Sequence, residues 1–138
     1  MKPELRDLID AYLRAVRESV ALLQDAGVFV AGPEGEWPLV GPRTGSLGAD
    51  SSYQMHGIGC TVHVNGIATD FDLGRRGETD GFDAWRLFRF IADHGFGCSY
   101  RSHRVLDADL QIAASAGEIV RLRDSQLYRL APSCGPTS

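Results

Sequence analysis

The stretch that decides the fold runs from residue 56 to residue 73 and reads HGIGCTVHVNGIATDFDL. At its centre, Asn65-Gly66 is a strong signal for a two-residue turn, because both residues tolerate a positive φ angle. Apolar and polar residues alternate on each side of this turn, as in strands with one buried face. The stretch therefore predicts an antiparallel hairpin of two strands, residues 56–64 and 67–73.

The position of the turn predicts which residues face each other across the hairpin. On the apolar face, the expected pairs are Val64 with Ile67, Val62 with Thr69, Cys60 with Phe71 and Ile58 with Leu73. On the polar face, they are His63 with Ala68, Thr61 with Asp70 and Gly59 with Asp72. Gly57 and Gly59 leave one end of the polar face bare, which often marks the close approach of a ligand or another backbone.

Two helices are expected to cover the hairpin. Residues 3–26 carry apolar side chains at steps of three and four and charged side chains on the other side, which predicts an amphipathic helix. Residues 80–94 predict a second, largely buried helix that Asp80 caps with help from Asp83. In this second helix we expect an apolar stripe formed by Trp85, Phe88 and Ala92 and widened by Leu87, Phe90 and Ile91.

The rest of the chain adds one loop-rich region and a shorter carboxy-terminal unit. Residues 31–52 hold most of the turn formers. Asp107 is expected to cap a short helix that runs to about Ala116 with Ile112 facing inward, and residues 118–130 predict a second hairpin. The fold class is therefore α+β: a small antiparallel sheet of two hairpins, packed against a long N-terminal helix and a second central helix. We expect one domain over residues 1–132 and a frayed tail over 133–138.

Composition and charge exclude several classes of function. The chain has 138 residues and a net charge of −4, from 14 Lys and Arg against 18 Asp and Glu. Nucleic-acid binding needs a basic stripe, whereas this balance suits a basic partner protein. No apolar run approaches the ~18 residues that a membrane span requires. The charged amino-terminus is unlike a signal peptide, so we expect a cytoplasmic protein.

Polar side chains concentrate between residues 56 and 83, and one interpretation of them is a metal site. Asp70 and Asp72 point to the same side of one strand, and Asp80 and His56 lie close in sequence. Carboxylate oxygens suit Mg²⁺ or Ca²⁺, although the ligand pattern of an EF-hand is absent.

A second interpretation is nucleophilic chemistry, and a third is structural. Cys60 could pair with His56 or His63, but the expected register turns His63 to the other face and leaves His56, on the same face, far along the strand. Ser51 and Ser52 lie in no nucleophile elbow. In the third interpretation the aspartates cap helix and turn backbone groups or pair with arginines, and the remainder forms an acidic patch. The four candidate arginines are Arg75, Arg76, Arg86 and Arg89. The sequence has no phosphate-binding loop, and we expect no cofactor.

The chain also resembles a family of small stand-alone bacterial proteins of unknown function. The resemblance rests on the HGIGC strand at 56–60, the DFDLG strand at 70–74 and the DGFDAWRL segment at 80–87. Leu73 stands where the family usually has an aromatic residue. Members of this kind resemble the immunity proteins that accompany secreted toxins, which is an analogy rather than a site argument.

The resemblance implies an immunity protein that binds and neutralises a cognate toxin, as a monomer or a homodimer. The residues expected to contact the toxin are Trp37, Glu34 and Glu36 in the loop-rich region and Asp70, Asp72 and Glu78 on the acidic face. The alternative function is a small metal-binding protein or hydrolase that uses Asp70, Asp72, Asp80 and His56.

Overall fold

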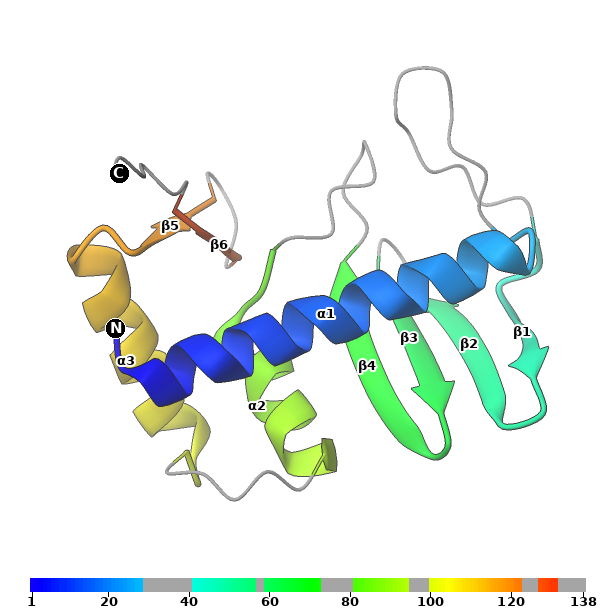
Figure 1. Ribbon diagram of the computed structural model, residues 1–138, viewed down its shortest axis with the longest axis horizontal. Helices are drawn as coiled ribbons and strands as arrows, with labels where there is room; N and C mark the ends of the chain where they lie inside the picture. Colours follow the sequence, from blue (N-terminus) through cyan, green and yellow to red (C-terminus); the bar gives the residue numbers. More distant parts are fainter. Residues whose placement is uncertain (29–40, 57–58, 73–80, 95–99, 123–126, 132–138) are drawn as a thin grey trace.

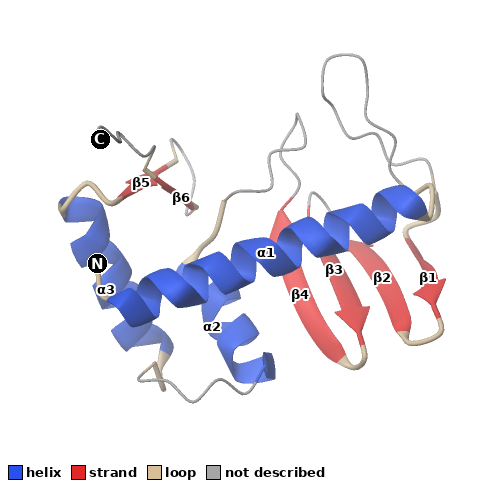
Figure 2. Ribbon diagram, in the orientation of Figure 1, coloured by secondary structure: helices blue, strands red, loops and turns tan. Residues whose placement is uncertain are grey.

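The computed structural model describes residues 1–28, 41–56, 59–72, 81–94, 100–122 and 127–131. Figure 1 and Figure 2 show the arrangement of its helices and strands. In chain order these elements are α1 (Pro3–Asp25), β1 (Thr44–Gly48), β2 (Ser51–His56), β3 (Gly59–Val64), β4 (Ile67–Asp72), α2 (Ala84–His94), α3 (His103–Ser115), β5 (Ile119–Arg121) and β6 (Tyr128–Leu130). The α+β class is confirmed.

The predicted hairpin is present as β3 and β4, with the predicted register. All six described pairs, from Gly59 with Asp72 to Val64 with Ile67, are as expected. The turn residues Asn65 and Gly66 have φ angles of 53° and 81°, which both lie in the left-handed region. The expected pair of Ile58 with Leu73 lies outside the described residues.

The turn provides a first testable prediction. Gly66→Ala should lower the free energy of unfolding by about 1–2 kcal/mol, because an L-residue in the left-handed region places its Cβ against the carbonyl oxygen. Urea denaturation would measure the loss. Asn65→Gly is the matched control, since glycine suits the same turn. A Gly66→Ala protein as stable as the wild type would contradict this account of the turn.

The strand between residues 56 and 64 is divided, which corrects the expectation of one continuous strand. β2 ends at His56 and β3 begins at Gly59, so these two strands form a second antiparallel pair. β1 pairs with β2 on the other side, and part of the region expected to be loop-rich is therefore strand. The four strands lie in the order β1-β2-β3-β4.

The carboxy-terminal hairpin forms a sheet of its own, whereas we expected it to join the first hairpin. β5 and β6 pair with each other, and Tyr128 forms a bridge with Phe82. The free edge of the larger sheet is occupied differently: α2 packs beside β4, and the Tyr12 hydroxyl donates a hydrogen bond to the Asp70 carbonyl at 2.5 Å. This contact takes an edge acceptor that a fifth strand would need.

α2 and α3 begin at capping side chains, whereas Lys2, the residue before α1, makes no side-chain cap. α1 matches its predicted range and is followed by Gly27 at a φ of 74°. α2 begins at Ala84 rather than residue 80, because Asp83 accepts a hydrogen bond from the Arg86 N–H at 2.7 Å and so acts as the cap. α3 begins at His103, capped by Ser102, so the prediction that Asp107 caps this helix is wrong.

Two predicted inward side chains are exposed. Trp85 on α2 is 57% exposed, and Ile112 on α3 is 67% exposed. The inward face of α2 is formed by Ala84, Leu87, Phe90 and Ile91, so the three residues expected to widen the stripe are buried. The stripe itself lies toward the outside, because Trp85 and Ala92 are exposed and Phe88 is half-buried.

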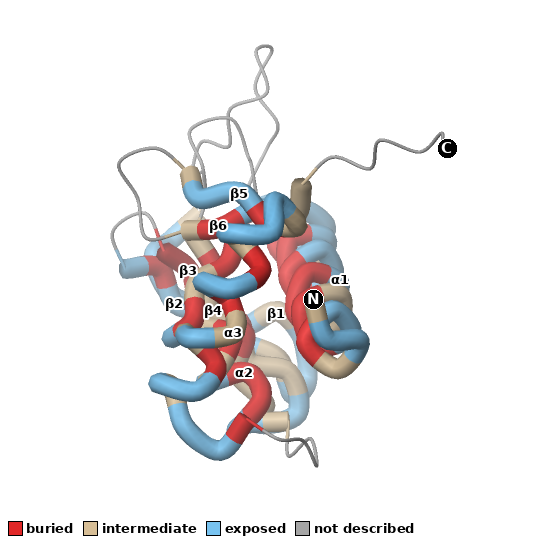
Figure 3. Tube along the Cα trace, turned by 90° about the vertical axis from the view of Figure 1, so that its left-hand side faces the viewer, coloured by how far each residue is buried: buried red, intermediate tan, exposed pale blue. Residues whose placement is uncertain are grey.

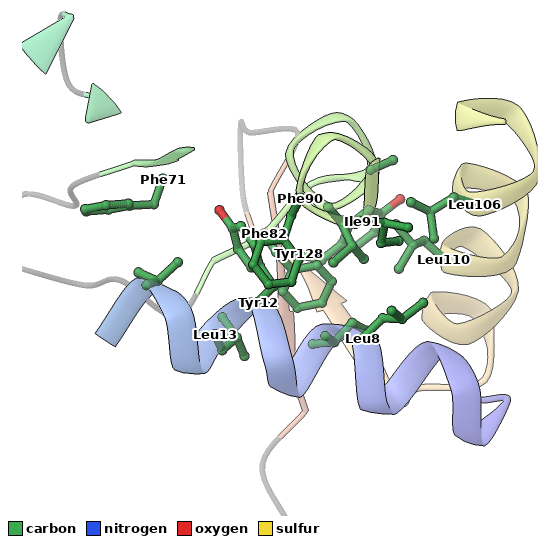
Figure 4. Packing of buried hydrophobic residues seen from close by; sticks show 14 of the residues in the cluster. Leu8, Tyr12, Leu13, Phe71, Phe82, Phe90, Ile91, Leu106, Leu110 and Tyr128 are labelled. Atoms are coloured by element: carbon green, nitrogen blue, oxygen red, sulfur yellow. The ribbon is translucent and has the colours of Figure 1, made fainter. Parts of the chain in front are cut away.

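One core connects α1 to the strands and to both other helices. Figure 3 shows buried residues along the side of α1 that faces the rest of the chain. Tyr12 is central: its ring lies edge-on to Phe90 at 5.5 Å, beneath the aromatic group that Figure 4 shows around Phe82 and Tyr128. Burial raises the pKa of the Tyr12 hydroxyl far above its usual value. No helix in the described ranges is both long enough and apolar enough to cross a bilayer.

Candidate functional site

The face of the larger sheet that points away from α1 carries the polar side chains that sequence analysis selected. Strand pairing places the polar partners on one side, while the buried partners, such as Cys60 and Phe71, face α1. We call this surface the polar sheet face. It consists of Thr44, Ser46, Ser52, Gln54, His56, Thr61, His63, Asp70 and Asp72.

A chain of hydrogen bonds crosses the polar sheet face. The His56 Nε2 atom lies 2.8 Å from the Thr61 hydroxyl, and this hydroxyl donates a hydrogen bond to Asp70. Asp70 also forms an ion pair with Arg89 of α2 at 2.9 Å. Three strands and one helix are thereby joined through a single line of polar atoms.

The bare position at Gly59 is explained by a neighbouring side chain. A Cβ atom at Gly59 would lie 3.0 Å from two atoms of the His56 ring, so the absence of a side chain lets this ring lie over the backbone. The close approach that the glycine indicated is therefore made by His56, which uses the space to reach Thr61.

Arg86 of α2 joins the remaining two aspartates. Its guanidinium contacts Asp72 at 2.7 Å and Asp83 at 2.5 Å. The carboxylates of Asp72 and Asp83 are only 20% and 16% exposed, so these ion pairs are partly shielded from water and are screened less than surface pairs. Asp83 thus caps α2 and also fixes the arginine that holds the helix to β4.

The structure brings His56, Asp70 and Asp72 to one face, as the metal-site hypothesis requires, but the aspartates already have cationic partners. Asp80, the fourth expected ligand, lies outside the described residues. Within the described part of the chain, no three side chains of His, Cys, Asp or Glu are grouped so as to hold a metal ion. The arrangement matches the structural interpretation, in which aspartates pair with Arg86 and Arg89.

Cys60 and His56 lie on opposite faces of the sheet, so they cannot form a thiol–imidazole pair. The chain turns between β2 and β3, so His56 lies opposite Gly59 and points away from the side of the sheet that holds Cys60; the expectation that the two share a face is wrong. Cys60 is fully buried, and burial raises the pKa of its thiol to about 12. A protonated thiol is a weak nucleophile.

This pKa leads to a second prediction. In a Cys98→Ser, Cys134→Ser background, a thiol reagent at about pH 8 should leave folded protein unlabelled, because the raised pKa keeps the Cys60 thiol protonated and the atom is buried. The same reagent should label the protein fully in denaturant, which serves as the control. Rapid labelling of the folded protein would contradict the burial.

A cavity of about 340 Å³ lies beside the first turn of α2. It borders α3 and the small sheet, and its wall is formed by Asp83, Ala84, Trp85, His103, Asp107, Gln111, Arg121 and Tyr128. Sequence analysis missed this feature because it assigned Trp85 to the core. The signal that could have found it is Asp83 as an alternative cap, which places Trp85 in the first turn of the helix.

Comparison with known proteins gives one match. Residues 5–130 match a family model described as Domain of unknown function (DUF6896). The chain belongs to the DUF6896 family. The match extends from the first turn of α1 to the end of β6, so the DUF6896 domain includes every described helix and strand apart from the first two residues of α1. No curated protein and no solved structure matches the chain.

The partner-binding residues expected in this DUF6896 chain fall into two groups. Asp70 and Asp72 lie on the polar sheet face, where both form ion pairs. The others, namely Trp37, Glu34, Glu36 and Glu78, lie outside the described residues, and their role stays a prediction.

Proposed function

We propose that this protein is an immunity protein that binds and neutralises a cognate bacterial toxin domain in the cytoplasm. The observation that carries the proposal is the polar sheet face: Ser52, Gln54 and His56 are exposed on it, and none of the described helices covers them. A sheet with one buried and one open face offers a rigid, flat surface for a partner.

Order within this face favours binding. Since Asp70 and Asp72 are already held by Arg89 and Arg86, their side chains have less conformational entropy to lose when a partner docks. The net charge of −4 would speed encounter with a basic toxin domain. The motif resemblance to small bacterial immunity-like proteins supports the same function. The protein would act as a monomer or a homodimer, without a cofactor.

The test is co-expression with the product of the adjacent gene, with capture and growth rescue scored in the same cells. Ser52→Arg, on the polar sheet face, should abolish rescue, because it places a bulky cation at the contact. Ser115→Arg, on an exposed residue at the end of α3, is the matched control and should rescue normally. Absence of capture and rescue by the wild type would reject the proposal, and rescue by Ser52→Arg would reject this interface.

The toxin contacts expected from sequence can be tested in the same assay. Trp37→Ala and the double change Asp70→Ala with Asp72→Ala are each expected to weaken protection. The double change also leaves Arg89 and part of Arg86 without partners, so melting curves must show that the protein remains folded. Full protection by both folded variants would place the toxin contact elsewhere.

The alternative function is a metal-binding protein or hydrolase, favoured by the placement of His56, Asp70 and Asp72 on one face. Thermal melting with Mg²⁺, Ca²⁺, Mn²⁺ or Zn²⁺ distinguishes it. A metal that binds only the folded state should add about 2.7 kcal/mol at a hundred times its dissociation constant. An unchanged melting temperature with all four metals would reject the metal version.

A further inference from the structure

We propose that the cavity beside Trp85 receives an arginine side chain of the partner protein. This inference rests on the proposed function, in that it takes the occupant to be a residue of a bound protein. It adds a specific anchor point, beside the first turn of α2, and the chemistry of the group that enters it.

One wall of the cavity is aromatic and is formed by Trp85. Trp85 is 57% exposed, yet its ring is held in place by an edge-on contact with His103 at 5.4 Å. Phe88 lies against both rings, at 6.4 Å from each. A large aromatic ring that is fixed and still open to solvent is a suitable platform for a planar guanidinium, which stacks on indole more favourably than an ammonium does.

The cavity also contains the carboxylate of Asp107, which has no cationic partner among the described residues. Asp107 lines the cavity and accepts one hydrogen bond, from the Gln111 side-chain amide at 2.8 Å. In the described ranges no cation pairs with it, whereas Asp109, two residues further along α3, is paired with Lys2 at 3.1 Å. Asp107 can therefore accept the forked N–H groups of an arginine.

The charge of the cavity favours a cation over an anion. Asp83 is already paired with Arg86, and Arg121 has interactions of its own, so Asp107 is the carboxylate of the wall that lacks a cation among the described residues. A carboxylate ligand would meet Asp107 without compensation. The volume of about 340 Å³ is at the lower end of the range for small-ligand sites and suits a single long side chain.

Ion pairs link the cavity wall to the polar sheet face. Asp83 forms part of the cavity wall and binds Arg86, which in turn contacts Asp72 on β4.

The experiment needs no toxin. Trp37→Phe leaves Trp85 as the one tryptophan, because the chain has two, and its fluorescence reports on the cavity. N-acetyl-arginine amide is titrated at low ionic strength, with N-acetyl-citrulline amide as the neutral analogue of the same shape and N-acetyl-glutamate amide as the anionic probe. We expect a saturable change with arginine and at least a fivefold weaker response with citrulline, as for about 1 kcal/mol of ionic interaction.

A charge-matched pair of variants tests the role of the carboxylate. Asp107→Asn should weaken arginine binding about threefold to fivefold, whereas Asp7→Asn, on an exposed residue of α1, should leave it unchanged. A linear, non-saturating response to arginine, equal binding of citrulline, preferential binding of glutamate or an unaffected Asp107→Asn protein would each overturn the proposal.

In the co-expression assay, Trp85→Ala should reduce capture and growth rescue. The expected cause is toxin binding that is at least tenfold weaker, as is typical when an anchoring tryptophan is truncated at an interface. Ile112→Ala removes a similarly exposed apolar side chain and should have little effect. The two proposals fail separately. Arginine binding without growth rescue rejects the immunity function alone. Growth rescue without arginine binding, or with full toxin binding by the Trp85→Ala protein, rejects the anchor alone.

Discussion

Phe82→Ala is expected to lower the free energy of unfolding by about 3–5 kcal/mol, which is the usual loss when a buried phenylalanine is truncated. Phe82 is fully buried, and its ring lies 6.2 Å from that of Tyr128. Its backbone also exchanges two hydrogen bonds with Tyr128, at 2.9 and 2.7 Å. The residue therefore joins the small sheet to the base of α2, and the cavity left by alanine would lie at this junction.

Urea denaturation of the purified variants would measure this loss. Phe88→Ala is the matched control, because Phe88 lies further along the chain, in α2, and is only half-buried. Its free energy of unfolding should fall by less than half as much. Since small domains are stable by only about 5–15 kcal/mol, the Phe82→Ala protein is expected to melt far below the wild type. Equal losses for the two variants would show that the small sheet is not held through Phe82.

Arg86→Ala is expected to lower the free energy of unfolding by about 2 kcal/mol. Removing one partner of a fully buried ion pair costs about 3–5 kcal/mol, and the Arg86 side chain is 25% exposed, which reduces that figure. The loss arises because Asp72 and Asp83 would then face each other in a partly shielded site without a cation between them.

Arg89→Ala provides the comparison on the same helix. Arg89 is 51% exposed and contacts only Asp70 among the ion pairs described, so its loss should stay below about 1 kcal/mol. Thermal and urea denaturation of both variants would establish the order. A larger loss for Arg89→Ala would mean that the line from His56 to Arg89, rather than the Arg86 bridge, holds α2 against the sheet.

The sequence predicts the hairpin well because its information is local. Asn65-Gly66 sets the turn, and from that point alternation alone determines that Asp70 and Asp72 share a face. The same local reasoning placed α1, whose apolar period continues without interruption from Leu5 to Leu23. The pairing of aspartates with arginines was also predicted as one alternative, although their partners among four arginines could not be selected without the geometry.

The errors arose where two local signals compete or where the decision is made by distant contacts. Asp80 and Asp83 are equally good caps in sequence, and the choice of Asp83 depends on Phe82 pairing with Tyr128, far along the chain. Trp85 lies in the first turn of α2, where it is exposed and lines the cavity. The separate small sheet is likewise a tertiary result, because nothing within residues 118–130 shows that α2 has already occupied the edge of β4.

The packing of α1 against β4 and α2 has a consequence for biosynthesis. α1 leaves the ribosome before β4 and α2, and the chain must grow from Asp25 to Ile67 before β4 begins to exist. At about 5–20 residues per second, this interval lasts seconds, during which the apolar stripe of α1 has no native surface to cover it. The nascent chain therefore presents an amphipathic helix to chaperones early, and the strands from β1 to β4, which pair with their neighbours in sequence, can assemble before that helix docks.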